Sequence, residues 1–181
     1  MRHEIRIAGF GGQGVIKAAL LTAIAAGLGE NKEVAQTQSY GPEARGGACR
    51  SDVIISDDTI EYIKPLNIDI FIVMSQPAMD QYAKELDLAH CTIIADATLV
   101  SKIPAGAKKV HRIMATAVAE KELGAALFAN IVMLGAMAAV TNLVGLAALQ
   151  NALDGNVLPK TIGTNRSALD RGYQLGLKGN S

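Results

Sequence analysis

The first residues with a pattern suited to chemistry form a glycine-rich run, GFGGQG, at positions 9–14. Gly9, Gly11 and Gly14 have the spacing GxGxxG, in which glycines make a tight turn and let the backbone approach a phosphate. A strand-like segment precedes this run, and apolar residues at helical spacing follow it. Because the start of a helix attracts anions, the turn is predicted to hold a phosphate-bearing ligand. Alternatively, the glycines serve only to pack the strand against the helix.

The turn lacks the other parts of two familiar nucleotide sites. An NAD site has an acidic residue at the end of the second strand, whereas the predicted strand 34–38 ends in glutamine and threonine and Glu33 falls at its beginning. A Walker A loop has a lysine directly after its last glycine, whereas Lys17 follows Gly14 by three residues. The sequence therefore argues against both sites.

A second group of polar residues lies in a long loop at positions 39–50. Arg45 stands beside two glycines and is a candidate for gripping a phosphate or a carboxylate of a partner. In the alternative interpretation Glu43 and Arg45 pair with each other. The candidate cofactor-binding residues of both segments are Gly9, Gly11, Gly12, Gln13, Gly14, Tyr40, Glu43, Arg45, Gly46 and Gly47.

Residues for independent catalysis or metal binding are not recognisable in the sequence. The three histidines are scattered without the spacing of a metal site. Cys49 and Cys91 lie far apart, so this chain alone is not expected to assemble a zinc site or an iron–sulfur cluster. Asp96 follows a buried strand and is expected to cap the next turn, with a position facing the site as the alternative. We predict no catalytic residue and no metal ligand in this chain.

Composition narrows the class of protein. The 181 residues suffice for a single domain, predicted to span positions 1–181. Half of them are hydrophobic but only 4% are aromatic, which is typical of a core between helices and a parallel sheet. With 17 basic and 17 acidic residues, the chain has no surplus charge to attract nucleic acid. The start of the sequence has no secretory signal, which indicates a cytoplasmic protein.

One segment, 123–149, has no charged residue and is long enough to cross a bilayer. Glycines, asparagines and a threonine interrupt it, and many of its apolar residues are alanines, which contribute little to insertion. We therefore predict two buried helices joined near residues 141–142 and no membrane contact.

Strand-like and helical segments alternate along the chain. This alternation predicts a Rossmann-like α/β fold: three layers, with a doubly wound, mostly parallel sheet and helices on both faces. Ligands of such sheets bind at the carboxyl edge, where the glycine turn, the loop 39–50, residues 75–76 and Asp96 would converge. The predicted strands are 5–8, 34–38, 52–56 with a possible hairpin partner at 59–63, 70–74, 92–95 and 110–114. The predicted helices include one from 15 to a left-handed glycine within 27–29, one at 76–87, and a last one capped by Thr164 or Asn165 and running to Leu177.

Three motifs together resemble the gamma subunit of 2-oxoacid:ferredoxin oxidoreductases. They are GFGGQG at 9–14, QSYGPEARGG at 38–47 and NIVMLG at 130–135, and the resemblance covers nearly the whole chain. It implies a subunit of a complex that oxidatively decarboxylates a 2-oxoacid with coenzyme A to acyl-CoA and reduces ferredoxin. It further implies alpha and beta partner subunits, with a delta subunit as a further candidate, that hold thiamine diphosphate and iron–sulfur clusters.

The resemblance implies that the isolated chain is inactive, and coenzyme A becomes the candidate ligand of the glycine turn at a site shared with partners. General similarity to stand-alone gamma chains favours 2-oxoglutarate over pyruvate and branched-chain 2-oxoacids. Two other functions stay open: a free-standing dinucleotide-binding oxidoreductase and a noncatalytic interaction module. The small residues at 130–135 would pack within the chain or, alternatively, against another subunit.

Overall fold

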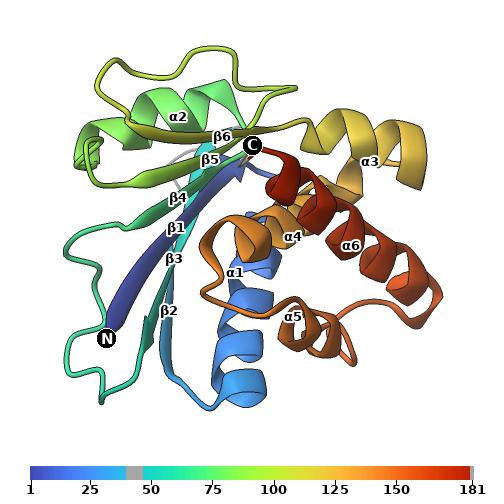
Figure 1. Cartoon of the computed structure of the whole chain (residues 1–181), viewed down its shortest axis with the longest axis horizontal. Coiled ribbons are helices and arrows are strands. Elements are labelled where there is room, and N and C mark those ends of the chain that lie inside the picture. Colours follow the sequence, from blue (N-terminus) through green and yellow to red (C-terminus); the bar gives the residue numbers. More distant parts are fainter. Residues whose placement is uncertain (40–46, 180–181) are drawn as a thin grey trace.

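The computed structural model describes residues 1–39 and 47–179, which form a six-stranded sheet between two layers of helices (Figure 1). The order of the strands is β2-β3-β1-β4-β5-β6. The parallel, helix-covered sheet expected from the sequence is confirmed, with one strand reversed. The strands are β1 (Arg2–Phe10), β2 (Glu33–Ser39), β3 (Ala48–Ser56), β4 (Ile70–Val73), β5 (Thr92–Asp96) and β6 (Lys109–Ile113).

The reversed strand is β3, which pairs antiparallel with both β1 and β2. Strands β1, β4, β5 and β6 are parallel neighbours. Because β3 lies between β1 and β2, the second strand of the chain is not the neighbour of the first, as it would be in a dinucleotide-binding fold. The carboxyl end of β1 therefore lies beside the start of β3.

The predicted hairpin partner at 59–63 is wrong, because this segment is not a strand. Side chains of β1 hold the backbone of residues 62–67, at the end of this segment and just after it, in place of a strand ladder. Arg2 donates to the carbonyl oxygens of Tyr62 and Lys64, and the carboxylate of Glu4 accepts from the backbone N–H groups of Leu66 and Asn67 at 2.5 and 2.7 Å.

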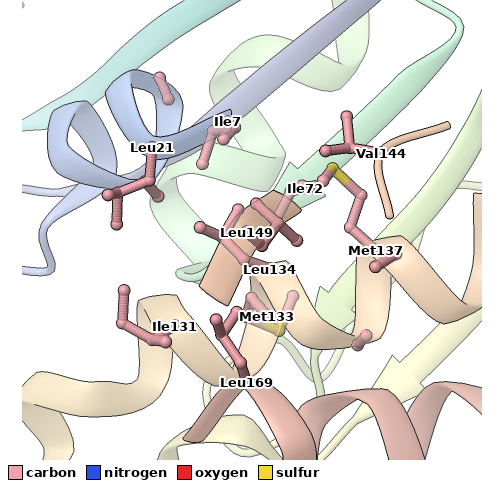
Figure 2. Packing of buried hydrophobic residues seen from close by; sticks show 14 of the residues in the cluster. Ile7, Leu21, Ile72, Ile131, Met133, Leu134, Met137, Val144, Leu149 and Leu169 are labelled. Atoms are coloured by element: carbon pink, nitrogen blue, oxygen red, sulfur yellow. The ribbon is translucent and has the colours of Figure 1, made fainter. Parts of the chain in front are cut away.

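Helices pack on alternate faces of the sheet because successive strand residues point to opposite sides. The larger cluster joins Ile7 and Ile72 to Leu21, Leu134 and Leu149 (Figure 2). The smaller cluster packs Phe71 and Val73 of β4 against α2. The helices are α1 (Val15–Ile24, continued as a π-turn to Gly29), α2 (Gln76–Tyr82), α3 (Ala115–Leu123), α4 (Ala129–Thr141), α5 (Leu146–Ala152) and α6 (Ile162–Lys178).

Two helix ends differ from expectation. The left-handed residue after α1 is Asn31 with φ 55°, not a glycine of 27–29. A Cβ at Gly29 would lie 2.8 Å from the Cβ of Ala148, so this glycine makes room for α5. Helix α6 begins before Thr164, after a 3₁₀ turn that starts at Pro159.

Helices α4 and α6 pack at very short range. A Cβ at Gly135 would collide with the carbonyl oxygen of Leu169, and one at Gly172 with that of Val132. Every residue of Ala129–Ala138 is buried. The small residues of the segment 130–135 therefore serve packing within the chain.

The uncharged segment 123–149 contains the end of α3, all of α4 and most of α5, and the chain turns at Asn142 with φ 51°. The two buried helices expected there are confirmed. Over residues 1–39 and 47–179, none of the helices has the length and apolar character needed to span a bilayer.

Candidate functional site

The glycine turn connects the carboxyl end of β1 to the start of α1. Gly12 and Gly14 have φ of 97° and 73°, values that side chains rarely allow. A Cβ at Gly9 would collide with the Oε1 atom of Gln13. Three of the four glycines are thus needed by the turn itself.

Gly11 is different. Its φ lies outside the left-handed region, and a Cβ there would meet no atom of the described chain within 4 Å. It is also exposed. No steric or conformational demand within the described residues therefore calls for glycine at this position, which leaves open backbone at the mouth of the turn.

The side chain of Gln13 joins two strand ends. Its Oε1 accepts a hydrogen bond of 2.9 Å from the backbone N–H of Phe10, and its Nε2 donates to the carbonyl oxygen of Met74 at 2.8 Å. The amide thus fixes the turn on the carboxyl edge of β1 and β4. Its polar atoms are used in holding the turn.

Asn130 of α4 holds the other end of the turn. Its Nδ2 donates to the carbonyl oxygen of Gly14 at 3.1 Å, and a Cβ on Gly14 would collide with this amide. Asn130 is 5% exposed. The first and third motifs of the resemblance therefore meet in space, although sequence reasoning did not place Asn130 among the site residues.

The start of α1 presents free N–H groups beside the turn. The first intrahelical bond runs from the N–H of Ala18 to the carbonyl oxygen of Gly14, so the N–H groups of Val15, Ile16 and Lys17 precede the ladder. The Lys17 ammonium turns away and donates to the carbonyl oxygen of Asn156 at 2.9 Å. The anion-attracting feature here is the backbone.

The loop of the second motif begins and ends at the same edge. Ser39 pairs with Arg50, and Ala48 pairs with Phe10, the last residue of β1. Gly47 therefore precedes a residue that is a direct neighbour of the glycine turn. The other candidate residues of this loop, Tyr40, Glu43, Arg45 and Gly46, lie outside the described residues.

An ion-pair network with a buried Arg6–Asp52 pair and an exposed Glu85 lies beside this loop. Arg6 donates to both carboxylate oxygens of Asp52 at 2.8 and 3.0 Å and to Glu85 at 2.7 Å. Arg50 also donates to Glu85 and stacks over the ring of Tyr82 at 5.1 Å. Burial alone would lower the pKa of Arg6, but Asp52 and Glu85 raise it. Burial alone would raise the pKa of Glu85, but the two guanidinium groups lower it.

Ser75 and Asp96, two further residues of the carboxyl edge, have structural partners within the chain. Ser75 caps α2 by accepting from the N–H of Ala78 at 3.3 Å. Asp96 is fully buried and accepts from the hydroxyl of Thr116 at 2.5 Å and from the N–H of Thr98 at 3.1 Å. The capping role expected for Asp96 is confirmed.

Burial makes both thiols poor nucleophiles. It raises the pKa of Cys49, and it raises that of Cys91 to about 12. In the described part of the chain, no three His, Cys, Asp or Glu side chains are grouped so that they could hold a metal ion.

Two comparisons with known proteins point to the same family. The model of the family described as pyruvate ferredoxin/flavodoxin oxidoreductase matches residues 4–175. The 2-oxoglutarate synthase subunit KorC of Methanocaldococcus jannaschii is 42% identical over 177 residues, which cover 97% of this chain and 94% of that protein.

Solved structures have the same fold. The gamma subunit of a keto/oxoacid ferredoxin oxidoreductase from Geobacter sulfurreducens is 36% identical, with a TM-score of 0.89 over 99% of this chain and 98% of that one. The 2-oxoglutarate:ferredoxin oxidoreductase of Magnetococcus marinus, solved with 2-oxoglutarate, coenzyme A and succinyl-CoA bound, has a TM-score of 0.81. It is 22% identical over 97% of this chain and 31% of that chain, a likeness of fold alone.

The family match extends over all three motifs, and the relatives of similar length are subunits of such enzymes. The resemblance inferred from the sequence is thereby confirmed. The chain belongs to the pyruvate ferredoxin/flavodoxin oxidoreductase family, as a gamma-type subunit of a 2-oxoacid:ferredoxin oxidoreductase.

Proposed function

We propose that this gamma-type subunit belongs to a cytoplasmic complex that converts 2-oxoglutarate and coenzyme A to succinyl-CoA, and that its glycine turn forms one wall of the coenzyme A site. The preference for 2-oxoglutarate rests on the identity of 42% with KorC of M. jannaschii, a 2-oxoglutarate synthase subunit. Pyruvate and branched-chain 2-oxoacids are the alternatives to be tested.

One observation supports the coenzyme A site above the others. Gly11 leaves open backbone next to the free N–H groups of α1, and the described chain itself gives no reason for a glycine there. A phosphate can approach such backbone directly and accept hydrogen bonds from the N–H groups of the helix start. The residues proposed to contact it are Gly11, Gly12 and Gly14, with Gly47 and the loop residues Tyr40, Glu43, Arg45 and Gly46 on the neighbouring wall.

The geometry disfavours a dinucleotide-dependent enzyme. The antiparallel strand β3 separates β1 from β2, and β2 ends at Ser39, with its Gln36 hydrogen-bonded to Ser51. An acidic residue for the ribose hydroxyls is not found at the end of β2 within the described chain. The turn can therefore hold a phosphate without the ribose contact that NAD requires.

The reaction needs chemistry that this subunit does not carry. We infer that alpha and beta subunits, and a delta subunit where present, hold thiamine diphosphate and the iron–sulfur clusters and pass electrons to ferredoxin. Two cysteines with raised pKa values are unsuited to binding a cluster. We expect the chain to form a single domain. Without its partner subunits, this domain is expected to be inactive.

The proposed contact between the glycine turn and coenzyme A is tested by Gly11→Ala in the complete complex. The added methyl group meets open space in the chain, so folding and assembly should be unchanged. It would hold the phosphate away from the backbone and cost about one charge-assisted hydrogen bond, roughly 1.5 kcal/mol. We expect the KM for coenzyme A to rise about tenfold, with the KM for 2-oxoglutarate unchanged, in an assay of ferredoxin reduction.

Gly163→Ala is the matched control, since a Cβ there also meets open space and Gly163 lies on α6, outside the glycine turn. It should leave both KM values unchanged. A Gly11→Ala complex that assembles normally and keeps its KM for coenzyme A would contradict the proposed site.

A further inference from the structure

The three histidines of the chain, scattered in sequence, come together at the amino edge of the sheet, opposite the glycine turn. They line a single cavity of about 540 Å³. We call it the histidine pocket. Its lining comes from the starts of β1, β4, β5 and β6 and from the end of α4: His3, Asp69, Ile70, His90, Thr92, Lys109, His111, Val140, Thr141, Asn142 and Leu143.

The central residue of the histidine pocket is His111 of β6. Its Nδ1 atom is buried and has no hydrogen-bond partner in the described part of the chain. Buried polar atoms in folded proteins are normally satisfied, so this nitrogen calls for an explanation. Because burial lowers the pKa of His111, its ring is neutral at neutral pH.

One carboxylate oxygen of the acidic residue in the pocket has partners within the chain. The Oδ2 atom of Asp69 accepts a hydrogen bond of 2.8 Å from the backbone N–H of Glu4 and lies 3.9 Å from Nδ1 of His3. His90, on the segment before β5, is held by Asp87 at 2.8 Å. Lys109 lines the same cavity at the start of β6 and brings an ammonium group to it.

The charge of the pocket depends on pH. With neutral histidines, Lys109 and Asp69 balance each other among the lining residues. Imidazolium groups on β1, on β6 and on the segment before β5 would add positive charge to the same lining, beside the end of α4 at Thr141. A divalent metal is disfavoured, because the described side chains form no group of three ligands close enough to hold one.

We propose that the histidine pocket binds a small oxyanion, such as a phosphate or a carboxylate, and that binding tightens as the histidines become protonated. The anion accepts hydrogen bonds from Lys109 and from the imidazolium groups, with the hydroxyl of Thr92 as a further donor. This site lies at the opposite edge of the sheet from the glycine turn and does not rest on the proposed function.

The chain has only three histidines, so NMR can follow each of them in the full-length protein. We would titrate inorganic phosphate into ¹³C-histidine-labelled chain at about pH 6 and about pH 7.5, at constant ionic strength with chloride as the reference ion. All three ring signals should shift along one saturation curve, with a dissociation constant at least about threefold lower at the acidic pH. Absence of a saturable shift with both phosphate and succinate would overturn the proposal.

Succinate in the same titration distinguishes a carboxylate from a phosphate, and saturation by either ion supports the site. Lys109→Gln should weaken binding several-fold. Its neighbour Lys108 is exposed but does not line the histidine pocket, which makes Lys108→Gln the matched control. Equal weakening by Lys109→Gln and Lys108→Gln would indicate a nonspecific effect of surface charge and contradict specific binding in the histidine pocket.

Discussion

Two amide side chains determine the shape of the glycine turn. Gln13 bridges the ends of β1 and β4, and Asn130 binds the carbonyl oxygen of Gly14. Both were visible in sequence motifs, but a motif does not tell which of its residues face a ligand and which hold the backbone. Gly11 is the residue of the turn that the described chain leaves unexplained, and it therefore carries the functional argument.

The two cysteine thiols lead to a prediction about individual residues. Cys91 is fully buried with a pKa of about 12, and the pKa of the half-buried Cys49 is also raised. Because thiolate is the reactive form, native Cys91 should react with iodoacetamide at pH 9 at least about a hundredfold more slowly than in unfolded chain. Mass spectrometry of timed samples measures this rate.

The raised pKa of Cys91 also affects the stability of the fold. A thiol whose folded pKa is raised contributes stability below its unfolded pKa of about 8.5, and this contribution is lost as the pH rises toward about 12. The loss of stability between pH 8.5 and 10.5 should therefore be smaller in Cys91→Ala than in the parent chain. Rapid alkylation of native Cys91 would contradict its burial and reopen a role for this thiol.

At the scale of elements, the closest packing is between α4 and α6. Gly172 lies against the carbonyl oxygen of Val132, and Gly135 lies against that of Leu169. Both helices belong to the layer that covers the larger core cluster (Figures 1 and 2). Since Asn130 extends from the same α4 to the glycine turn, this packing also positions the candidate site.

A pair of alanine variants on α6 tests this contact. Gly172→Ala should reduce the free energy of unfolding by about 2–3 kcal/mol, because its methyl group has no room. Gly163→Ala has open space on the same helix and should raise the free energy of unfolding by roughly 0.5–1 kcal/mol. Urea unfolding followed by circular dichroism measures both. Similar effects of the two variants would contradict the close contact.

Sequence patterns located most elements but not their pairing. The apolar runs gave the strands at 70–74 and 92–95 and the buried helices on either side of Asn142, because each pattern depends on local burial. The reversal of β3 was missed, since no local residue encodes its neighbours. The segment 59–63 was mistaken for a strand, since local spacing does not show that Arg2 of β1 binds the carbonyl oxygen of Tyr62 in place of a strand partner.

The candidate site, like the fold, could be predicted only in part from the sequence. The glycine spacing predicted the turn correctly, and the convergence of the turn with Gly47 at one edge followed from the topology. The contact of Asn130 with Gly14 and the gathering of three distant histidines depend on tertiary packing. Sequence spacing alone cannot show such contacts.

At the scale of the whole molecule, the two edges of the sheet have different roles. The carboxyl edge carries the glycine turn and both described ends of the second motif. The amino edge carries the histidine pocket. The proposed coenzyme A site and the proposed anion site therefore lie at opposite edges of the sheet.

The central claim is that this chain works as the gamma subunit of a 2-oxoglutarate:ferredoxin oxidoreductase. The most direct measurement is coenzyme A-dependent reduction of ferredoxin by the complex purified through a tag on this chain from its native source. We expect a complex with larger companion chains whose kcat/KM is highest for 2-oxoglutarate among 2-oxoglutarate, pyruvate and 2-oxoisovalerate. A chain that purifies alone, or a complex that acts only on another 2-oxoacid or without coenzyme A, would contradict this account.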